Sequence, residues 1–218
     1  MTATISERPG TVFIIDDDAS FLRSVSRLLR ASGYAVRTFG SAREFLDELG
    51  PDQHGCVIVD LQMPGLDGLE LQRALRQSSN PLPVIFLSGQ GDIPSTVRAM
   101  RHGAEDFLTK RAPKEHLFSA VKRALARDAK QRLRRQRQQE LGSRFATLSE
   151  REMEVLSHVL RGEMNKQIAS ELGVNERTVK LHRTSITRKL GVFSVAELAR
   201  LSVEAGVFTG EAGDLGQD

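Results

Sequence analysis

Thr11–Ser20 reads TVFIIDDDAS, an apolar run that ends in three adjacent aspartates. The run Val12–Ile15 predicts a buried strand, because a short continuous apolar segment is typical of a strand covered on both faces. Three neighbouring anions do not stabilise a buried strand. Their mutual repulsion must be relieved by a cation, by strong solvation or by a site that uses the charges.

Similar apolar runs recur through the first half of the chain and alternate with segments of helical periodicity. The expected strands are Val12–Ile15, Tyr34–Phe39, Cys56–Val59, Val84–Leu87 and Asp106–Leu108. Between them, apolar residues such as Ile93, Val97 and Met100 share one helical face, as in helices that cover a sheet. This alternation predicts an α/β fold, a doubly wound five-stranded parallel sheet in the flavodoxin-like order 2-1-3-4-5. Its working site should lie beyond the carboxyl ends of the strands, where the aspartates stand.

Charge is distributed unevenly along the 218 residues. Residues 1–120 contain 13 Lys/Arg and 15 Asp/Glu, a net charge of −2, whereas residues 121–210 contain 18 and 10, a net charge of +8. An acidic first half and a basic second half predict two domains, the second with a polyanionic partner.

The chain shows neither an apolar segment near its start nor a run of about 18 apolar residues that could cross a membrane. Its single cysteine, Cys56, lies in an apolar run and is expected to be a reduced, buried packing residue. These features predict a cytoplasmic protein without a membrane partner.

The second half reads as helical throughout. Residues 126–145, rich in Arg and Gln and free of Pro, predict an exposed linker helix that breaks at Gly142 and Ser143. Ser149 and Glu152 form a capping box that opens the next helix. The expected divisions are 10–125, 126–145, 146–207 and a tail at 208–218.

Carboxylates gather at one edge of the predicted sheet. Asp16, Asp17 and Asp60 follow strands 1 and 3, which are neighbours in the expected order, and such oxygen ligands suit Mg²⁺. Ser88 ends the fourth strand and Lys110 follows the fifth, so a hydroxyl and an ammonium converge on the carboxylates. A carboxylate nucleophile, Mg²⁺, a hydroxyl and a lysine together predict an aspartyl-phosphate site.

The motifs IIDDD, VDLQMPGLDG, FLSG and DFLTK, spread over about residues 10–125, resemble the receiver domain of bacterial two-component response regulators. The resemblance implies that Asp60 accepts a phosphoryl group from a sensor histidine kinase. It also implies that Asp16, Asp17 and Asp60 hold Mg²⁺, helped by the main-chain carbonyl of Gln62.

By the same resemblance, Ser88 and Lys110 contact the phosphoryl group, and Phe107 occupies the position of an aromatic switch residue. An ordinary core role for Phe107 is nearly as well supported. One departure from the family pattern concerns Arg111, which follows Lys110 where receivers usually have a proline in a cis peptide. A cis bond before a non-proline residue costs about 2.5–4 kcal/mol, so we expect a rearranged loop and an altered dephosphorylation rate.

A helix-turn-helix is predicted by the spacing of a short helix at Lys166–Leu172, a turn containing Gly173 and a longer helix at Glu176–Leu190. Val179, Ile186 and Leu190 form the expected core-facing seam, although an amphipathic core helix would also show basic residues on its outer face.

Residues from about 146 to 207 resemble the four-helix DNA-binding domain of LuxR-type regulators. The resemblance implies that the last helix, Ser194–Leu201, pairs two subunits. The residues that it implies for the major groove are Thr178, Lys180, Leu181, Arg183 and Thr184, and those for DNA phosphates are Lys166, Arg177, Arg188 and Lys189.

Together the two halves resemble FixJ-type response regulators, including those that control aromatic-hydrocarbon (styrene) degradation. The expected function is transcription regulation: phosphorylation promotes a homodimer, which binds promoter DNA and acts on RNA polymerase, while the only catalysis is the receiver's own phosphorylation and dephosphorylation. The sequence leaves two alternative interpretations open. One is a phosphatase of the haloacid-dehalogenase type, with Asp16 as nucleophile and Asp18 as acid, and the other is a receiver that acts by protein docking with an idle basic domain.

Overall fold

The computed structural model describes residues 10–78, 80–89 and 93–207. The chain divides into two compact units between Arg132 and Leu133, here called unit 1 and unit 2. The predicted tail at 208–218 lies outside the described residues. No helix in the described ranges is both long and apolar enough to cross a membrane.

Unit 1 contains a parallel sheet in the order β2-β1-β3-β4-β5, which confirms the predicted topology. Its strands are β1 (Thr11–Ile15), β2 (Val36–Phe39), β3 (Gly55–Asp60), β4 (Val84–Ser88) and β5 (Asp106–Thr109). The helices that follow them are α1 (Ala19–Ala31), α2 (Ala42–Glu48), α3 (Gly68–Gln77), α4 (Ile93–Arg101) and α5 (Lys114–Phe145).

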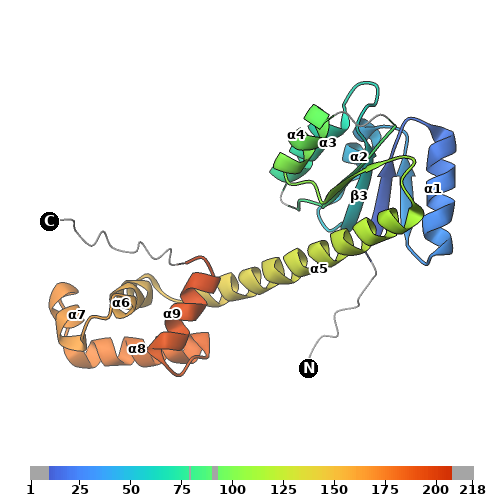
Figure 1. Cartoon of the computed structure of the whole chain (residues 1–218). Coiled ribbons are helices and arrows are strands. Elements are labelled where there is room, and N and C mark those ends of the chain that lie inside the picture. The colour runs from blue at the N-terminus through green and yellow to red at the C-terminus, as the bar shows by residue number, and fades with distance from the viewer. Residues whose placement is uncertain (1–9, 79, 90–92, 208–218) are drawn as a thin grey trace. The chain divides into compact units, whose positions relative to one another are not determined.

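Helices cover both faces of this sheet (Figure 1). On one face, Phe13, Val57 and Phe86 pack with residues of α2, α3 and α4. On the other, Ile14 and Ile58 pack with residues of α1 and the first part of α5. Successive strand residues point to opposite faces, so each central strand contributes to both layers of the core.

Two apolar residues of α4, Val97 and Met100, are exposed rather than packed against the sheet. Ser95 and Ala99 are buried, whereas Val97 is 42% exposed and Met100 is 46% exposed. Helical periodicity shows which residues share a face, but it does not show which face is buried. Here Ser95 and Ala99 face the core, because their small side chains let α4 pack closely against it.

The predicted helix break at Gly142 and Ser143 is wrong, because α5 continues through both residues to Phe145. In unit 1, Asp128 on α5 is buried and accepts a hydrogen bond from the main-chain N–H of Gly55 at 3.0 Å. In unit 2, Leu141 and Phe145 of the same helix lie in the hydrophobic core. The expected linker at 126–145 is therefore shared between the cores of the two units.

Unit 2 consists of the end of α5 and four further helices among the described residues. These helices are α6 (Glu150–Leu160), α7 (Asn165–Glu171), α8 (Glu176–Leu190) and α9 (Val195–Glu204). The capping box of Ser149 and Glu152 is confirmed at the start of α6. The core-facing seam of α8 is confirmed as well, since Val179, Ile186 and Leu190 are all at most 1% exposed.

Candidate functional site

Three aspartates meet at the carboxyl edge of the sheet in unit 1. Strands β1 and β3 are hydrogen-bonded neighbours with Ile15 opposite Val59, so the residues that follow, Asp16 and Asp60, also lie side by side. Asp16 is 1% exposed and Asp60 is 8% exposed, whereas Asp17 is exposed. One oxygen from each of the three carboxylates lies within 4.8 Å of the others, a spacing that could hold a metal ion.

Lys110 supplies the positive charge next to these carboxylates. Its Nζ lies 2.6 Å from Asp16 Oδ2 and 2.8 Å from Asp60 Oδ2, and 4.5 Å from the centre of the Phe21 ring. Burial disfavours the Lys110 ammonium, but hydrogen bonds to Asp16 and Asp60 outweigh this and raise the pKa of Lys110. Burial raises the pKa of Asp16 despite its bond to Lys110.

The departure from the usual Lys-Pro sequence does not prevent Lys110 from reaching the site. The described part of the chain contains no cis peptide bond, so Lys110 and Arg111 are joined in the trans form. The main-chain N–H of Lys110 donates to the carbonyl of Ser88 at 2.8 Å, and that of Ala112 donates to Thr109 at 2.9 Å. These bonds hold the residues after β5 in a tight turn from which the Lys110 side chain extends inward.

The loop after Asp60 returns closely to the site. The Gly68 N–H donates to the Leu61 carbonyl at 3.1 Å, and Asp67 caps α3 by accepting from the main-chain N–H of Glu70. A Cβ atom at Gly68 would lie 2.4 Å from the Asp60 carbonyl oxygen, so only glycine fits there. Sequence reasoning missed this role of Gly68, although the glycine lies in the VDLQMPGLDG motif and starts α3.

Ser88 and Phe107 lie where the sequence predicts. Ser88 is 2% exposed at the end of β4, beside the carboxylates. Phe107 on β5 is half-buried and stacks on Phe86, with ring centres 6.0 Å apart. This position suits both the switch and the core interpretation of Phe107.

Asp18 has a structural role that argues against the haloacid-dehalogenase alternative. Its carboxylate caps α1 by accepting hydrogen bonds from the main-chain N–H groups of Ser20 at 2.8 Å and Phe21 at 3.1 Å. The bonds from Phe21 and Ser20 lower the pKa of Asp18, which keeps it ionised and makes it a poor general acid.

The helix-turn-helix of unit 2 is formed by α7, the turn at 172–175 and α8. Gly173 takes the left-handed conformation in the turn, with φ of +66°. Asn175 caps α8 by accepting from the main-chain N–H of Thr178 at 2.9 Å and from its hydroxyl at 3.0 Å. The cap fixes where α8 begins and therefore which of its side chains face away from the core.

The nine predicted DNA-contacting residues differ in whether their side chains already bond to other groups of the protein. Arg183 donates to Asn165 Oδ1 at 3.0 Å, and Thr178 is bonded to the α8 cap. Lys189 donates to Glu152 Oε2 at 2.6 Å and to the carbonyl of Thr147 at 2.9 Å. The remaining six are exposed, although the Thr184 hydroxyl donates to the Lys180 carbonyl at 3.0 Å: Lys166, Arg177, Lys180, Leu181, Thr184 and Arg188.

The Lys189–Glu152 pair was missed because its partners lie 37 residues apart in sequence. Glu152 is 5% exposed, and its hydrogen bond with Lys189, assisted by Ser185 and Ser149, lowers the pKa of Glu152 to about 2. Its charge is therefore retained at neutral pH and joins the start of α6 to the end of α8.

Comparison with known proteins assigns a family to each unit. Residues 12–122 match the response regulator receiver domain, and residues 146–202 match the luxR family of bacterial regulatory proteins. The response regulator protein TodT of Pseudomonas putida is 42% identical over 198 residues, which cover 91% of this chain and 87% of TodT. Nodulation protein W of Bradyrhizobium diazoefficiens is 44% identical over 204 residues, which cover 94% of this chain and 90% of that protein.

Solved structures agree with these relatives. The response regulator StyR is 44% identical and superimposes with a TM-score of 0.79, covering 90% of this chain and 99% of StyR. Full-length FixJ from B. japonicum is 36% identical with a TM-score of 0.55, covering 92% of this chain and 98% of FixJ. The chain therefore belongs to the two-component response regulators of the FixJ type, in which a receiver domain regulated by phosphorylation is joined to a LuxR-type DNA-binding domain that regulates transcription.

Proposed function

We propose that Asp60 accepts the phosphoryl group from a cognate sensor histidine kinase. The strongest support is the position of Lys110, whose Nζ lies 2.8 Å from Asp60 and 2.6 Å from Asp16. An Asp60 carboxylate oxygen attacks the phosphorus atom, and the bond from phosphorus to the kinase histidine nitrogen breaks. The Lys110 ammonium then faces the negative charge of the phosphoryl oxygens.

In this proposal Asp16, Asp17 and Asp60 hold Mg²⁺, with the main-chain carbonyl of Gln62. The three carboxylates offer oxygens within 4.8 Å of one another, and an all-oxygen donor set fits the preferences of this ion. When bound, Mg²⁺ supplies positive charge that stabilises the transferring phosphoryl group. The main-chain N–H of Asp18 orients Asp16 through a bond of 2.9 Å.

Ser88 and Phe107 carry the signal to the surface in the same proposal. Phosphorylation adds a charge of about −1.5 to −2, which draws the Ser88 hydroxyl toward the phosphoryl group. Phe107 then turns inward, and the surface of α4 and β5 changes. The half-buried position of Phe107 supports this movement, because part of its side chain is still exposed and can become more buried.

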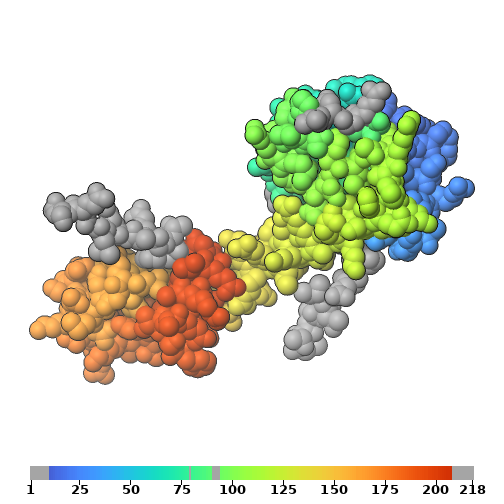
Figure 2. Space-filling view, viewed as in Figure 1, coloured from blue at the N-terminus to red at the C-terminus, as the bar shows by residue number. Residues whose placement is uncertain are grey.

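We infer that phosphorylation promotes a homodimer. In Figure 2, the residues of α4, β5 and the first part of α5, coloured green to yellow-green, lie together on the face of unit 1 turned to the viewer. Val97 and Met100 of α4 are 42% and 46% exposed, and a second receiver that docks on α4 would cover such apolar side chains. In unit 2, Val195 and Val203 of α9 are 45% and 64% exposed, which supports pairing through α9.

We further infer that α8 enters the major groove of promoter DNA and that the bound dimer acts on RNA polymerase. The exposed Lys180, Leu181 and Thr184 are the best-supported base contacts, and the exposed Arg177 and Arg188 the best-supported phosphate contacts. Regulation of an aromatic-hydrocarbon pathway stays a prediction, as does the restriction of catalysis to the receiver's own phosphoryl chemistry.

Arg111 is proposed to change the lifetime of the phosphorylated protein. It stands in the turn beside Lys110, where a guanidinium could reach a phosphoryl oxygen. The Arg111→Pro variant should therefore lose its phosphoryl group at a rate different from that of the native protein, as measured from the decay of radiolabel. Equal lifetimes would contradict this role.

The experiment that tests the proposed function combines phosphorylation with DNA binding. Asp60→Ala should incorporate no label from a histidine kinase and should keep only basal binding to DNA fragments selected from a random pool. Asp47→Ala, whose side chain is 67% exposed on α2, serves as the matched control and should be labelled normally. Beryllofluoride, a phosphoryl mimic, should tighten DNA binding of the native protein and of Asp47→Ala but not that of Asp60→Ala. Kinase-dependent labelling of Asp60→Ala would overturn the assignment.

A further inference from the structure

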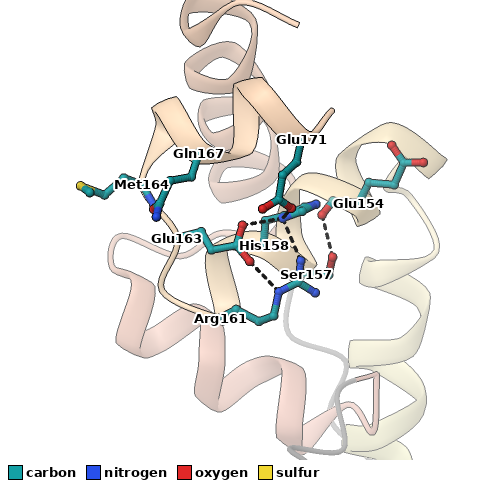
Figure 3. Close-up of polar contacts among 8 residues, drawn as sticks. All are labelled: Glu154, Ser157, His158, Arg161, Glu163, Met164, Gln167 and Glu171. Atoms are coloured by element: carbon teal, nitrogen blue, oxygen red, sulfur yellow. Dashed lines mark hydrogen bonds and ion pairs between the residues drawn. The ribbon is translucent and has the colours of Figure 1, made fainter. Parts of the chain in front are cut away.

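A second cluster of possible metal ligands lies in unit 2, away from the receiver site (Figure 3). His158 is in the last turn of α6, Glu163 is in the turn that follows, and Glu171 ends α7. One ligand atom from each lies within 4.8 Å of the others. Their side chains are 11%, 20% and 57% exposed, so the cluster is half-buried and open on the Glu171 side.

The Nδ1 atom of His158 has three polar neighbours that no single protonation state satisfies. Glu163 Oε2 lies at 2.6 Å, Arg161 Nη2 at 2.8 Å and Glu171 Oε2 at 3.2 Å. A neutral Nδ1 can accept from Arg161, but its lone pair then faces two carboxylates. A protonated Nδ1 can donate to Glu163, but its N–H then faces the N–H group of Arg161.

A metal ion resolves this conflict, because an imidazole lone pair and two carboxylate oxygens can then all act as ligands. We propose that His158 Nδ1, Glu163 and Glu171 bind a divalent first-row transition-metal ion, of which Zn²⁺ fits best. Imidazole suits Zn²⁺ and its neighbours in the series rather than Mg²⁺, and water completes the coordination on the exposed side.

Arg161 is the natural competitor for this position. Its Nε donates to Glu163 Oε1 at 2.7 Å, so its guanidinium supplies the positive charge that the metal would bring. Because the side chain of Arg161 is 49% exposed, it can move into solvent when the ion binds. Removing Arg161 should therefore tighten metal binding, whereas removing a partner that merely supports the fold would not.

The ion would link the end of α6 to the end of α7, the first helix of the helix-turn-helix. Without it, the contact between them within the cluster is that of His158 Nδ1 with Glu171 Oε2 at 3.2 Å, while the main-chain N–H of Glu163 donates to the His158 carbonyl at 3.2 Å and holds only the turn after α6. The metal would thus fix α7 relative to α6 and order the surface from which α8 meets DNA. Metal availability would then set DNA affinity independently of phosphorylation.

Calorimetric titration of the full-length protein with Zn²⁺ alone tests the site. Asp17→Asn serves as the background, because it weakens the acidic cluster of unit 1 and isolates binding in unit 2. We expect one ion per chain, an affinity reduced by about 10-fold or more in Glu171→Gln, and a tighter complex in Arg161→Ala. Glu171 is exposed enough for the substitution to leave the fold intact, which circular dichroism checks.

Glu154→Gln is the matched control, because Glu154 is a half-exposed carboxylate on α6 that pairs with Arg151 outside the cluster. It should bind Zn²⁺ as the background protein does. The metal should also raise the unfolding temperature of the background protein and leave that of Glu171→Gln unchanged. Absence of binding, or binding that is equal in Glu171→Gln and the background, would overturn the proposal.

Discussion

Gly68 lies against the main-chain carbonyl oxygen of Asp60 so closely that a Cβ atom on Gly68 would come within 2.4 Å of it. The same Cβ would lie 3.0 Å from Cε1 of Phe86, a ring that is fully buried. Neither neighbour can move without displacing β3 or the core. Gly68 therefore determines how closely the start of α3 approaches the candidate phosphorylation site.

Gly68→Ala is expected to shift Asp60 and to lower both phosphoryl acceptance and stability. Overpacking of this kind costs about 1–3 kcal/mol, which urea unfolding can measure. Gly89→Ala is the control, because a Cβ there meets no atom within 4 Å although Gly89 lies at the same edge of the sheet. Native phosphorylation and stability in Gly68→Ala would show that the loop yields more easily than its contacts indicate.

Lys110→Met should separate metal binding from phosphoryl transfer. The substitution removes the positive charge 2.6 Å from Asp16 and 2.8 Å from Asp60 and keeps the length of the side chain. Because that charge repels a divalent cation, we expect tighter Mg²⁺ binding by calorimetry at pH 8 together with slower phosphorylation. Lys114→Met, an exposed change at the start of α5, should alter neither. A parallel fall in both quantities would instead indicate that Lys110 chiefly supports the fold of the site.

The Glu152–Lys189 pair predicts a specific pH dependence of stability in unit 2. The pKa of Glu152 falls from 4.5 to about 2 on folding, so its contribution is fully present above pH 4.5 and is lost as the pH falls toward 2. Because the side chain of Lys189 is 33% exposed, solvent screens the pair, and we expect this contribution to be about 1 kcal/mol.

Urea unfolding between pH 2 and pH 7 should therefore show the native protein and Glu152→Gln converging as the pH decreases. Glu150→Gln, an exposed change two residues before Glu152 in the first turn of α6, is the control and should follow the native curve. A constant difference between native protein and Glu152→Gln at all pH values would rule out the charge as its cause.

Gly142→Ala is expected to stabilise the protein. Gly142 lies within α5, where alanine is favoured over glycine by about 0.5–1 kcal/mol, and its added Cβ meets no atom within 4 Å. Gly33→Ala provides the contrast, because Gly33 has equal space but a φ of +86°, which alanine adopts at a cost. The free energy of unfolding in urea should therefore rise for Gly142→Ala and fall for Gly33→Ala.

Local patterns in the sequence predicted much of this structure. The strands, their order and the meeting of Asp16 with Asp60 follow from apolar runs and from the geometry of parallel sheets. The capping box of Ser149 and Glu152 follows from residue type and spacing. In each case the deciding interaction is local or is imposed by a fold with few alternatives.

The errors arose where distant contacts outweigh local preference. A glycine in a helix costs about 1 kcal/mol, yet α5 continues through Gly142 because Leu141 and Phe145 bury their side chains in the core of unit 2. The sequence likewise gives no sign that Lys189 meets Glu152, since an exposed basic residue near the end of α8 looks the same whether it contacts DNA or a carboxylate. The cluster at His158 needs residues from three segments and has no recognisable spacing.

The place of Leu141 and Phe145 has a consequence for exchanging output domains between regulators. The luxR family match begins at residue 146, yet these two side chains, 0% and 4% exposed, belong to the core of the same unit. A hybrid gene joined at residue 146 would take both positions from a different regulator, whose residues there pack against a different DNA-binding domain. Functional recombination should therefore favour crossover points upstream of Leu141, so that the inherited module includes the last two turns of the preceding helix.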